Sequence, residues 1–328
     1  MIGLAIGAIV AALVFDFLNG FHDAANSIAT IVGTRILKPL PAVGIAAFAN
    51  FVGPFLFGVA VATTIGKGII HPDFVTLNII IGALAGAIVW DIITWILGLP
   101  TSSSHALVGG ILGAGLAGAG SKALIFGGLQ TVLTGIVISP IAGLAISFLV
   151  ALLIMRFFAK TKPHTVNSVF GKLQLVSSTY FSLTHGANDG QKTMGVIALI
   201  LLTQGVITKF EIPSYVIIMA ATAMSLGTFF GGWRIIKTMA MKITNLRPYQ
   251  GFSAETGAAT ILATLAWAGI PASTTHAISG GIMGVGAVRR LSAVRWGVGK
   301  RIVWAWIITI PASASVAFVI TLIINGLK

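Results

Sequence analysis

A sixteen-residue peptide occurs twice in this chain. PTSSSHALVGGILGAG spans residues 100–115 and PASTTHAISGGIMGVG spans 271–286, with nine of the sixteen positions identical. Such a match, 171 residues apart, indicates an internal duplication and strongly limits the possible architectures. The chain is therefore expected to hold two homologous transmembrane repeats, residues 1–159 and 173–328, joined by a short cytoplasmic linker at 160–172.

The surroundings of these repeats are predicted to be a lipid bilayer. Hydrophobic residues make up 56% of the chain and charged residues 8%, a composition that a soluble core cannot hide. Several apolar runs have the length of about 20 residues that crosses roughly 30 Å of hydrocarbon as a helix. The chain has no cysteine, which excludes disulfides, thiolate metal sites and cysteine nucleophiles. The net charge of +13 is interpreted as a topology signal, so no nucleic-acid partner is expected.

The basic residues predict how the repeats are oriented. Fifteen of the twenty Lys and Arg residues lie in four clusters, at 35–38, 156–172, 234–247 and 289–301. If both termini are extracellular or periplasmic and each half crosses five times, with the duplicated peptide as one crossing, all four clusters are cytoplasmic. An odd number of crossings inverts the second half. The expected fold class is an all-α polytopic membrane protein of two inverted-topology repeats with broken or re-entrant helical hairpins.

The number of crossings is less well determined. Residues 122–158 are too long for one span and contain Pro140, matched at the same offset by Pro311. This predicts an extra short helix in each half. If the duplicated peptides are re-entrant hairpins instead of crossings, these extra helices would have to span the membrane to keep the parity odd.

Two stripes of polar residues interrupt the apolar helices. They comprise Asp16, Asn19, Asp23 and Asn26 in the first half, and Ser182, His185, Asp189 and Lys192 in the second. A charge at the bilayer centre costs about 3 kcal/mol or more, so the stripes should face protein or water. Gly20 and Gly186 are expected to interrupt both helices and to free backbone groups for a ligand. The alternative is a polar network that only holds helices together.

Each duplicated peptide begins with proline and continues with hydroxyl residues, a pattern typical of a chain break before a capped helix start. The hydroxyl residues are Ser102, Ser103 and Ser104 in the first copy, and Ser273, Thr274 and Thr275 in the second. Helix starts favour anions, so two of them could clasp one tetrahedral oxyanion from opposite sides. The alternative is ordinary N-capping. His105 and His276 follow the hydroxyls and either contact the ligand or proton, or bond within their own turn.

These segments resemble a known family. DFLNGFHDAANSIAT at 16–30, THGANDGQKTMG at 184–195 and the two Pro-Ser-His peptides are similar to the paired signatures of the inorganic phosphate transporter (PiT) family. The resemblance covers nearly the whole chain and implies an inverted repeat with two helical hairpins, in which phosphate enters with a cation. The family's phosphate contacts map onto Asp23, Asn26, Ser102, Ser103, Ser104, Asp189, Ser273, Thr274 and Thr275. The hydroxyls and Asn26 are the expected direct donors, and the carboxylates are assigned to coupling.

One departure from the sodium-coupled pattern concerns the second half. Where those members carry an asparagine in both halves, this chain has Asn26 and Lys192. An ammonium there would repel sodium, and would either attract phosphate or pair with a neighbouring aspartate. The chain thus resembles the bacterial low-affinity, proton-coupled branch, which includes carriers of metal-phosphate complexes. The expected coupling groups are Asp23, Asp189, Glu255, Asn188 and His22, with Asn19, His105, His185 and His276 as further candidates.

The predicted function is import of inorganic phosphate by a secondary symporter of the cell membrane that works by alternating access. It would act alone or as a homodimer, with no cofactor beyond a co-transported proton or sodium ion and an optional Mg or other divalent cation. The alternatives are a sodium-coupled symporter, a sulfate permease of the same family and a passive anion channel. An intramembrane hydrolase is disfavoured because the serines and histidines form two equivalent sets, whereas an enzyme needs one nucleophile with one base.

Overall fold

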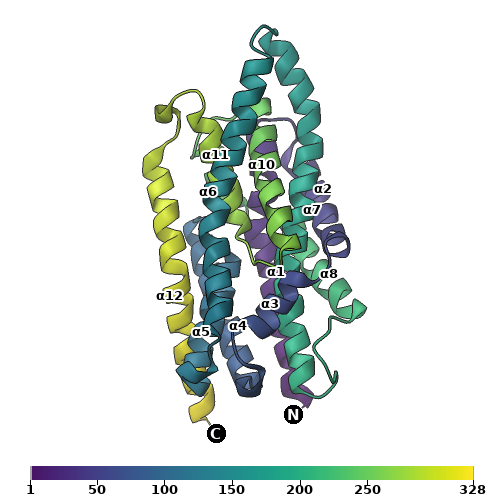
Figure 1. Cartoon of the computed structure of the whole chain (residues 1–328), viewed down its shortest axis with the longest axis vertical. Coiled ribbons are helices and arrows are strands. Elements are labelled where there is room, and N and C mark those ends of the chain that lie inside the picture. Colours follow the sequence, from purple (N-terminus) through teal and green to yellow (C-terminus); the bar gives the residue numbers. More distant parts are fainter. Residues whose placement is uncertain (1, 328) are drawn as a thin grey trace.

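The computed structural model describes residues 2–327, and nearly all of them are helical (Figure 1). The first half contains α1 (Ile2–Gly33), α2 (Pro39–Leu56), α3 (Ala60–Gly68), η1 (Pro72–Phe74), α4 (Leu77–Leu97), α5 (Ser103–Ala119), η2 (Ser121–Ala123) and α6 (Phe126–Phe157). The second contains α7 (Pro163–Thr203), α8 (Ser214–Phe230), α9 (Trp233–Met241), α10 (Pro248–Trp267), α11 (Thr274–Ala287), η3 (Leu291–Ala293) and α12 (Trp296–Gly326). Within residues 2–327 no strand is formed.

The two halves repeat the same order of α-helices in opposite directions. In Figure 1, α1 rises from the end that holds both termini, whereas α7 descends toward that end. The last helices of the halves, α6 and α12, likewise run in opposite directions. These courses are what an inverted repeat predicts.

The duplicated peptides form one arm each of two helical hairpins. The helices α4 and α5 turn back on each other at residues 98–102, and α10 and α11 do so at 268–273. The hairpins enter from opposite ends of the molecule (Figure 1). Their tips meet inside it, where the Thr275 hydroxyl donates a hydrogen bond of 3.0 Å to the Thr101 carbonyl oxygen. Of the two arrangements considered for the duplicated peptides, crossing or hairpin, the structure has the hairpin, since each peptide begins at a hairpin tip.

Several helices have the length and apolarity of membrane spans. These are α1, α2, α4, α6 and α12 among the described residues, with a sixth candidate if α8 and α9, bent by 68° at their break, form one span. The chain is thus a multi-pass membrane protein, although α4 serves as a hairpin arm. Its outer helices present exposed apolar side chains such as Val137, Ile141, Ile307 and Leu322.

The predicted extra short helices are not formed. Pro140 lies inside the continuous α6 and Pro311 inside the continuous α12. A helix of 32 residues is about 48 Å long, so it extends beyond the hydrocarbon without needing a second element. In the first half α3 follows α2 after a break at residues 57–59.

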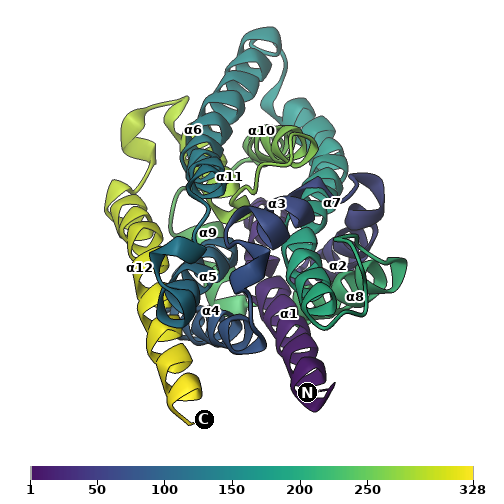
Figure 2. The same cartoon turned by 60° about the horizontal axis from the view of Figure 1, so that its bottom comes forward.

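Each half is packed against helices of the other half. Figure 2 shows α12 beside α4 and α5, and α6 beside α10 and α11. In the same exchanged manner α1 packs on α8, and α7 packs on α2. A Cβ on Gly20 would lie 2.1 Å from the Met224 carbonyl oxygen, and one on Gly186 would lie 2.2 Å from that of Asn50. The prediction that these glycines interrupt the helices is wrong, since they instead let continuous helices approach closely.

The basic clusters gather at one end of the molecule. One surface cavity is lined by Arg35, Lys237 and Arg295, and another by Arg247 and Arg289 beside the turn between α6 and α7. That turn occupies residues 158–162, so residues 163–172 of the expected linker are helical and belong to α7.

Candidate functional site

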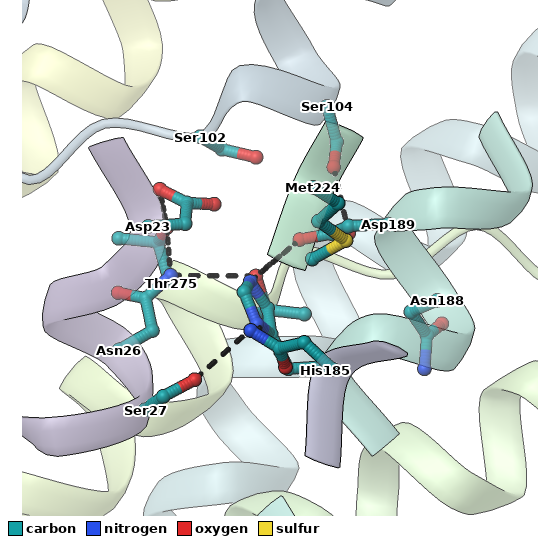
Figure 3. A network of polar contacts seen from close by, with 12 residues as sticks. Asp23, Asn26, Ser27, Ser102, Ser104, His185, Asn188, Asp189, Met224 and Thr275 are labelled. Carbon is teal, nitrogen blue, oxygen red and sulfur yellow. Dashed lines mark hydrogen bonds and ion pairs between the residues drawn. The ribbon is translucent and has the colours of Figure 1, made fainter. Parts of the chain in front are cut away.

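The two polar stripes and the two hairpin tips form one buried cluster in the middle of the fold (Figure 3). Its members come from α1 (Asp23 and Asn26), α7 (His185, Asp189 and Lys192), α5 (Ser104) and α11 (Thr274 and Thr275). None of these residues is more than 6% exposed. Helical periodicity explains the convergence, because residues three or four apart share a face and each stripe turns that face inward.

Donors from both hairpins converge on the Asp189 carboxylate. One oxygen, Oδ1, lies 3.3 Å from the Ser104 hydroxyl, and the other, Oδ2, lies 2.9 Å from the Thr274 hydroxyl. The ammonium of Lys192 contacts Asp189 Oδ1 and Ser104 Oγ and donates to the Ala272 carbonyl oxygen at 2.9 Å. Of the two predicted roles of Lys192, the structure shows the pairing with a neighbouring aspartate. The hydroxyl donors of the two hairpins thus bind a carboxylate of the chain itself, that of Asp189.

The first stripe faces the tip of the second hairpin. The side-chain amide of Asn26 donates to the hydroxyl of Thr275 at 2.9 Å and lies 3.4 Å from that of Thr274. The Thr275 hydroxyl is also 3.4 Å from Asp23 Oδ1. Asn26 is therefore hydrogen-bonded to the tip of the second hairpin, and its role as a direct phosphate donor stays a prediction.

Three buried ligand groups form a candidate cation site. One ligand atom each from Asp23, His185 and Asp189 lies within 4.8 Å of the other two, and His185 Nε2 is 3.2 Å from Asp189 Oδ2. Ligands that share one divalent transition metal at about 2.1 Å lie within about 4.2 Å of one another, so a small adjustment would allow these three groups to bind it. Two carboxylates and an imidazole also suit the chemistry of such a cation.

Partners behind these groups fix their orientation. Nδ1 of His185 lies 3.3 Å from Ser27 Oγ and 3.1 Å from Asn50 Oδ1. His22 is hydrogen-bonded to Asp23 at 2.9 Å, and its Nε2 is 3.2 Å from Thr94 Oγ1. Ser27, Asn50 and Thr94 were not predicted. Their only signal in the sequence is a polar residue within an apolar run.

Glu255 lies in a separate polar pocket. Its carboxylate accepts hydrogen bonds from Thr30 and Ser177 at 2.5 Å each and from Gln174 at 3.0 Å. Thr30 lies one helical turn beyond Asn26 on α1, so this pocket adjoins the central cluster. Leu84 occupies the matching position of the first half, so the carboxylate of Glu255 has no counterpart there. Gln174 and Ser177 also escaped prediction, although their spacing places them on one face of α7.

Other predicted site residues do not bond to the central carboxylates in the structure. The hydroxyls of Ser102 and Ser273 accept from the backbone amides of His105 and His276 at 3.4 and 3.2 Å, as helix N-caps. The side-chain amide of Asn188 points away from the cluster (Figure 3) and donates to the Thr184 and Leu262 carbonyls. Ser103 Oγ and Asn19 Oδ1 are buried with no hydrogen-bond partner in the described chain.

The paired histidines lie behind the hairpin tips. The rings of His105 and His276 meet edge to face with centroids 4.3 Å apart, and His276 stacks on Trp306 at 3.8 Å. They line a largely apolar groove of about 500 Å³ between α6 and α12. They are therefore not among the side chains that bond to Asp189 or Asp23.

The charges of the cluster determine which ligands it accepts. Asp23 and Asp189 contribute two carboxylates against the ammonium of Lys192, so with neutral histidines the cluster is negative overall. Burial removes the solvent that would screen this charge. An anion placed among these residues would meet this negative charge.

Comparison with known proteins identifies similar proteins among phosphate transporters. Residues 19–317 match the model of the phosphate transporter family. A "Probable low-affinity inorganic phosphate transporter" of Rhizobium meliloti is 53% identical over 96% of this chain and 94% of its own length. A protein of Bacillus subtilis with the same name is 43% identical over 98% and 97%, respectively.

A solved structure has the same fold along its full length. It is titled "The sodium-dependent phosphate transporter", is 27% identical and has a TM-score of 0.89, with 99% of this chain and 100% of that chain covered. The resemblance predicted from the paired signatures is confirmed by these matches. The chain belongs to the phosphate transporter family, whose members are transporters and not enzymes.

Proposed function

We propose that the protein is a symporter that imports inorganic phosphate by alternating access. The observation that carries this proposal is the convergence of Ser104 and Thr274, from two different hairpins, on a single oxyanion. Phosphate is a tetrahedral oxyanion that such hydroxyl donors fit. The names of the relatives support phosphate as the substrate.

In this mechanism the Asp189 carboxylate competes with phosphate for the same donors. While Asp189 is ionised, it holds Ser104, Thr274 and Lys192. A proton or cation that neutralises Asp189 would release these donors, and phosphate would then take its place between the hairpins. Coupling follows because neither ligand binds well without the other.

We assign the coupling ion as a proton, with a divalent metal as an optional companion of phosphate. The solved relative is titled sodium-dependent, but the ammonium of Lys192 lies against Asp189 here and would oppose a sodium ion at that carboxylate. The group of Asp23, His185 and Asp189 supports a divalent cation as cargo. Glu255 is a second candidate proton carrier because its pocket adjoins Asn26 through Thr30.

The orientation is proposed from the basic clusters. Their gathering at one end supports a cytoplasmic location for that end under the positive-inside rule. Both termini, at the opposite end (Figure 1), would then be extracellular or periplasmic. Rocking of the two repeats against each other would expose the central cluster to each side in turn.

The test is uptake of labelled phosphate into proteoliposomes. Phosphate should accumulate when an inward proton gradient is imposed, with or without sodium, and arsenate should compete better than sulfate. Repeating the assay with Mg²⁺ tests the metal-phosphate form. Uptake that requires sodium at fixed pH and leaves the lumen unacidified would overturn proton coupling. Equilibration without accumulation would indicate a channel.

A further inference from the structure

A second cavity lies at the end of the molecule where the basic clusters gather. It measures about 790 Å³, and its lining includes Arg35, Lys237 and Arg295 but no Asp or Glu. We call it the basic pocket. All three basic residues are exposed, and Trp233 and Met241, which are 45% and 60% exposed, add apolar surface at its rim. A pocket of this kind has both a charged and an apolar part.

Arg35 occupies an unusual backbone conformation within this pocket. Among the described residues it is the one non-glycine with a positive φ, +62°, whereas the six other positive-φ positions are glycines. A side chain in this left-handed region meets a steric penalty that glycine avoids. In a chain with 40 glycines, an arginine at this position calls for a reason outside the backbone.

The inverted half shows that the turn itself does not need arginine. The helices α1 and α7 end with the same pattern of backbone hydrogen bonds. In α1, Arg35 N donates to Val32 O at 3.0 Å and Ile36 N to Ile31 O at 3.1 Å. In α7, Gly205 N donates to Leu202 O at 3.1 Å and Val206 N to Leu201 O at 2.9 Å. Glycine fills this position in α7, as is usual at helix ends. The backbone turn therefore does not account for the arginine in α1.

We propose that the basic pocket binds a phosphate group, through Arg35 and Lys237 with Arg295 nearby. A guanidinium matches the oxygens of a phosphate group in a bidentate manner, and lysine adds a point charge. One guanidinium nitrogen of Arg295 already donates to the Met241 carbonyl oxygen at 2.9 Å, so fewer of its donors remain for a ligand. Two sources share this chemistry: the headgroup of an anionic phospholipid, whose chains would lie along Trp233 and Met241, and free inorganic phosphate.

The test uses Arg35→Gly, the substitution that the second half already contains. The purified full chain in an uncharged detergent is titrated with dihexanoyl phosphatidylglycerol, with zwitterionic dihexanoyl phosphatidylcholine and with inorganic phosphate, and the thermal unfolding midpoint is followed. Arg35→Gly, Lys237→Gln and their double variant are compared with wild type. Lys162→Gln, at the same end but outside the basic pocket, is the matched control.

Without ligand, Arg35→Gly should unfold at the wild-type temperature or higher, which separates binding from folding. An anionic ligand should raise the midpoint of the wild type and of Lys162→Gln. Its apparent affinity should fall roughly tenfold in the double variant, as expected for the loss of two basic contacts at a membrane surface.

The titrations also identify the source of the phosphate group. A variant-sensitive response to phosphatidylglycerol assigns the basic pocket to a lipid headgroup, and one to inorganic phosphate assigns it to the free ion. The transport site is intact in every variant, so its contribution cancels. Equal responses of the double variant and the wild type to both anions would overturn the proposal, whether or not the chain transports phosphate.

Discussion

The buried ammonium of Lys192 pairs with the carboxylate of Asp189, one turn earlier on α7. Neither residue is more than 1% exposed, so each offsets the other's loss of hydration. Removing one partner of such a pair leaves an uncompensated charge and typically costs about 3–5 kcal/mol. Variants of this pair can therefore distinguish an effect on stability from an effect on transport.

Replacing Lys192 by Met should lower the free energy of unfolding by about 3 kcal/mol, because Asp189 would remain charged and buried. Adding Asp189→Asn should restore most of that loss by removing the carboxylate's charge. Proton-driven uptake should be absent from both variants. Thermal unfolding and uptake are measured on the same preparations. Equal stability of the single and double variants would show that the charges of Lys192 and Asp189 do not stabilise each other.

The two serines Ser102 and Ser104 should respond differently to alanine. Ser102→Ala removes an N-cap, so it should lower stability by about 1 kcal/mol and change the KM for phosphate little. Ser104→Ala removes a donor to the central oxyanion, so it should raise KM about tenfold at nearly unchanged stability. Transport kinetics and thermal unfolding distinguish them. The same change in both variants would contradict the assignment of separate roles.

Glu255→Gln should abolish proton-driven accumulation but preserve exchange of phosphate across the membrane. Glutamine resembles a glutamate that never releases its proton, so the site would load and unload substrate without coupling. Net uptake and counterflow are compared in the same proteoliposomes. Glu211→Gln, at an exposed position between α7 and α8, is the control and should behave as wild type. Accumulation at the wild-type rate in Glu255→Gln would assign Glu255 a purely structural role.

Gly20→Ala should destabilise the protein, whereas Gly7→Ala in the same helix should not. A Cβ at position 20 would lie 2.1 Å from the Met224 carbonyl oxygen, but one at position 7 meets nothing within 4 Å. Forcing α1 away from α8 should cost about 1–3 kcal/mol, while Gly7→Ala should gain up to about 1 kcal/mol from helix propensity. The unfolding midpoints of the two variants test this, and similar shifts would argue against close packing as the role of Gly20.

Much of the fold follows from short-range patterns in the sequence. Apolar length gives the helices, and the duplication of Pro100–Gly115 gives the two repeats. The crossing count did not follow, because an apolar hairpin arm such as α4 has the same composition and length as a span. In the structure α4 ends at its C-cap Gly98, whose φ is +63°, and the chain reverses before α5. The contact of this tip with the opposing one, where Thr275 donates to Thr101, joins residues 174 apart and has no local signal in the sequence.

The candidate site could be predicted where it depends on helical faces. Asp23, Asn26, Asp189 and Lys192 lie together because their spacing places each set on one side of a helix. The different hydrogen-bond partners of the hairpin hydroxyls were not predictable, since Ser102 and Ser104 look equivalent in sequence. Ser102 lies just outside α5 as its N-cap, whereas Ser104 lies in the first turn with its hydroxyl toward Asp189. The residues that donate hydrogen bonds to Glu255 lie on α1 and α7, far from it in the sequence, and no pattern in the sequence links them to it.

The exchanged packing of the hairpins has a consequence for biosynthesis. The first hairpin lies against α12, a helix of the second half that leaves the ribosome long after α4 and α5. Until then α4 and α5 lack a large part of their protein partner, so the nascent first half must wait in the membrane with that surface against lipid or a chaperone. Truncation before α12 should thus leave the early helices inserted but vulnerable to quality-control proteases.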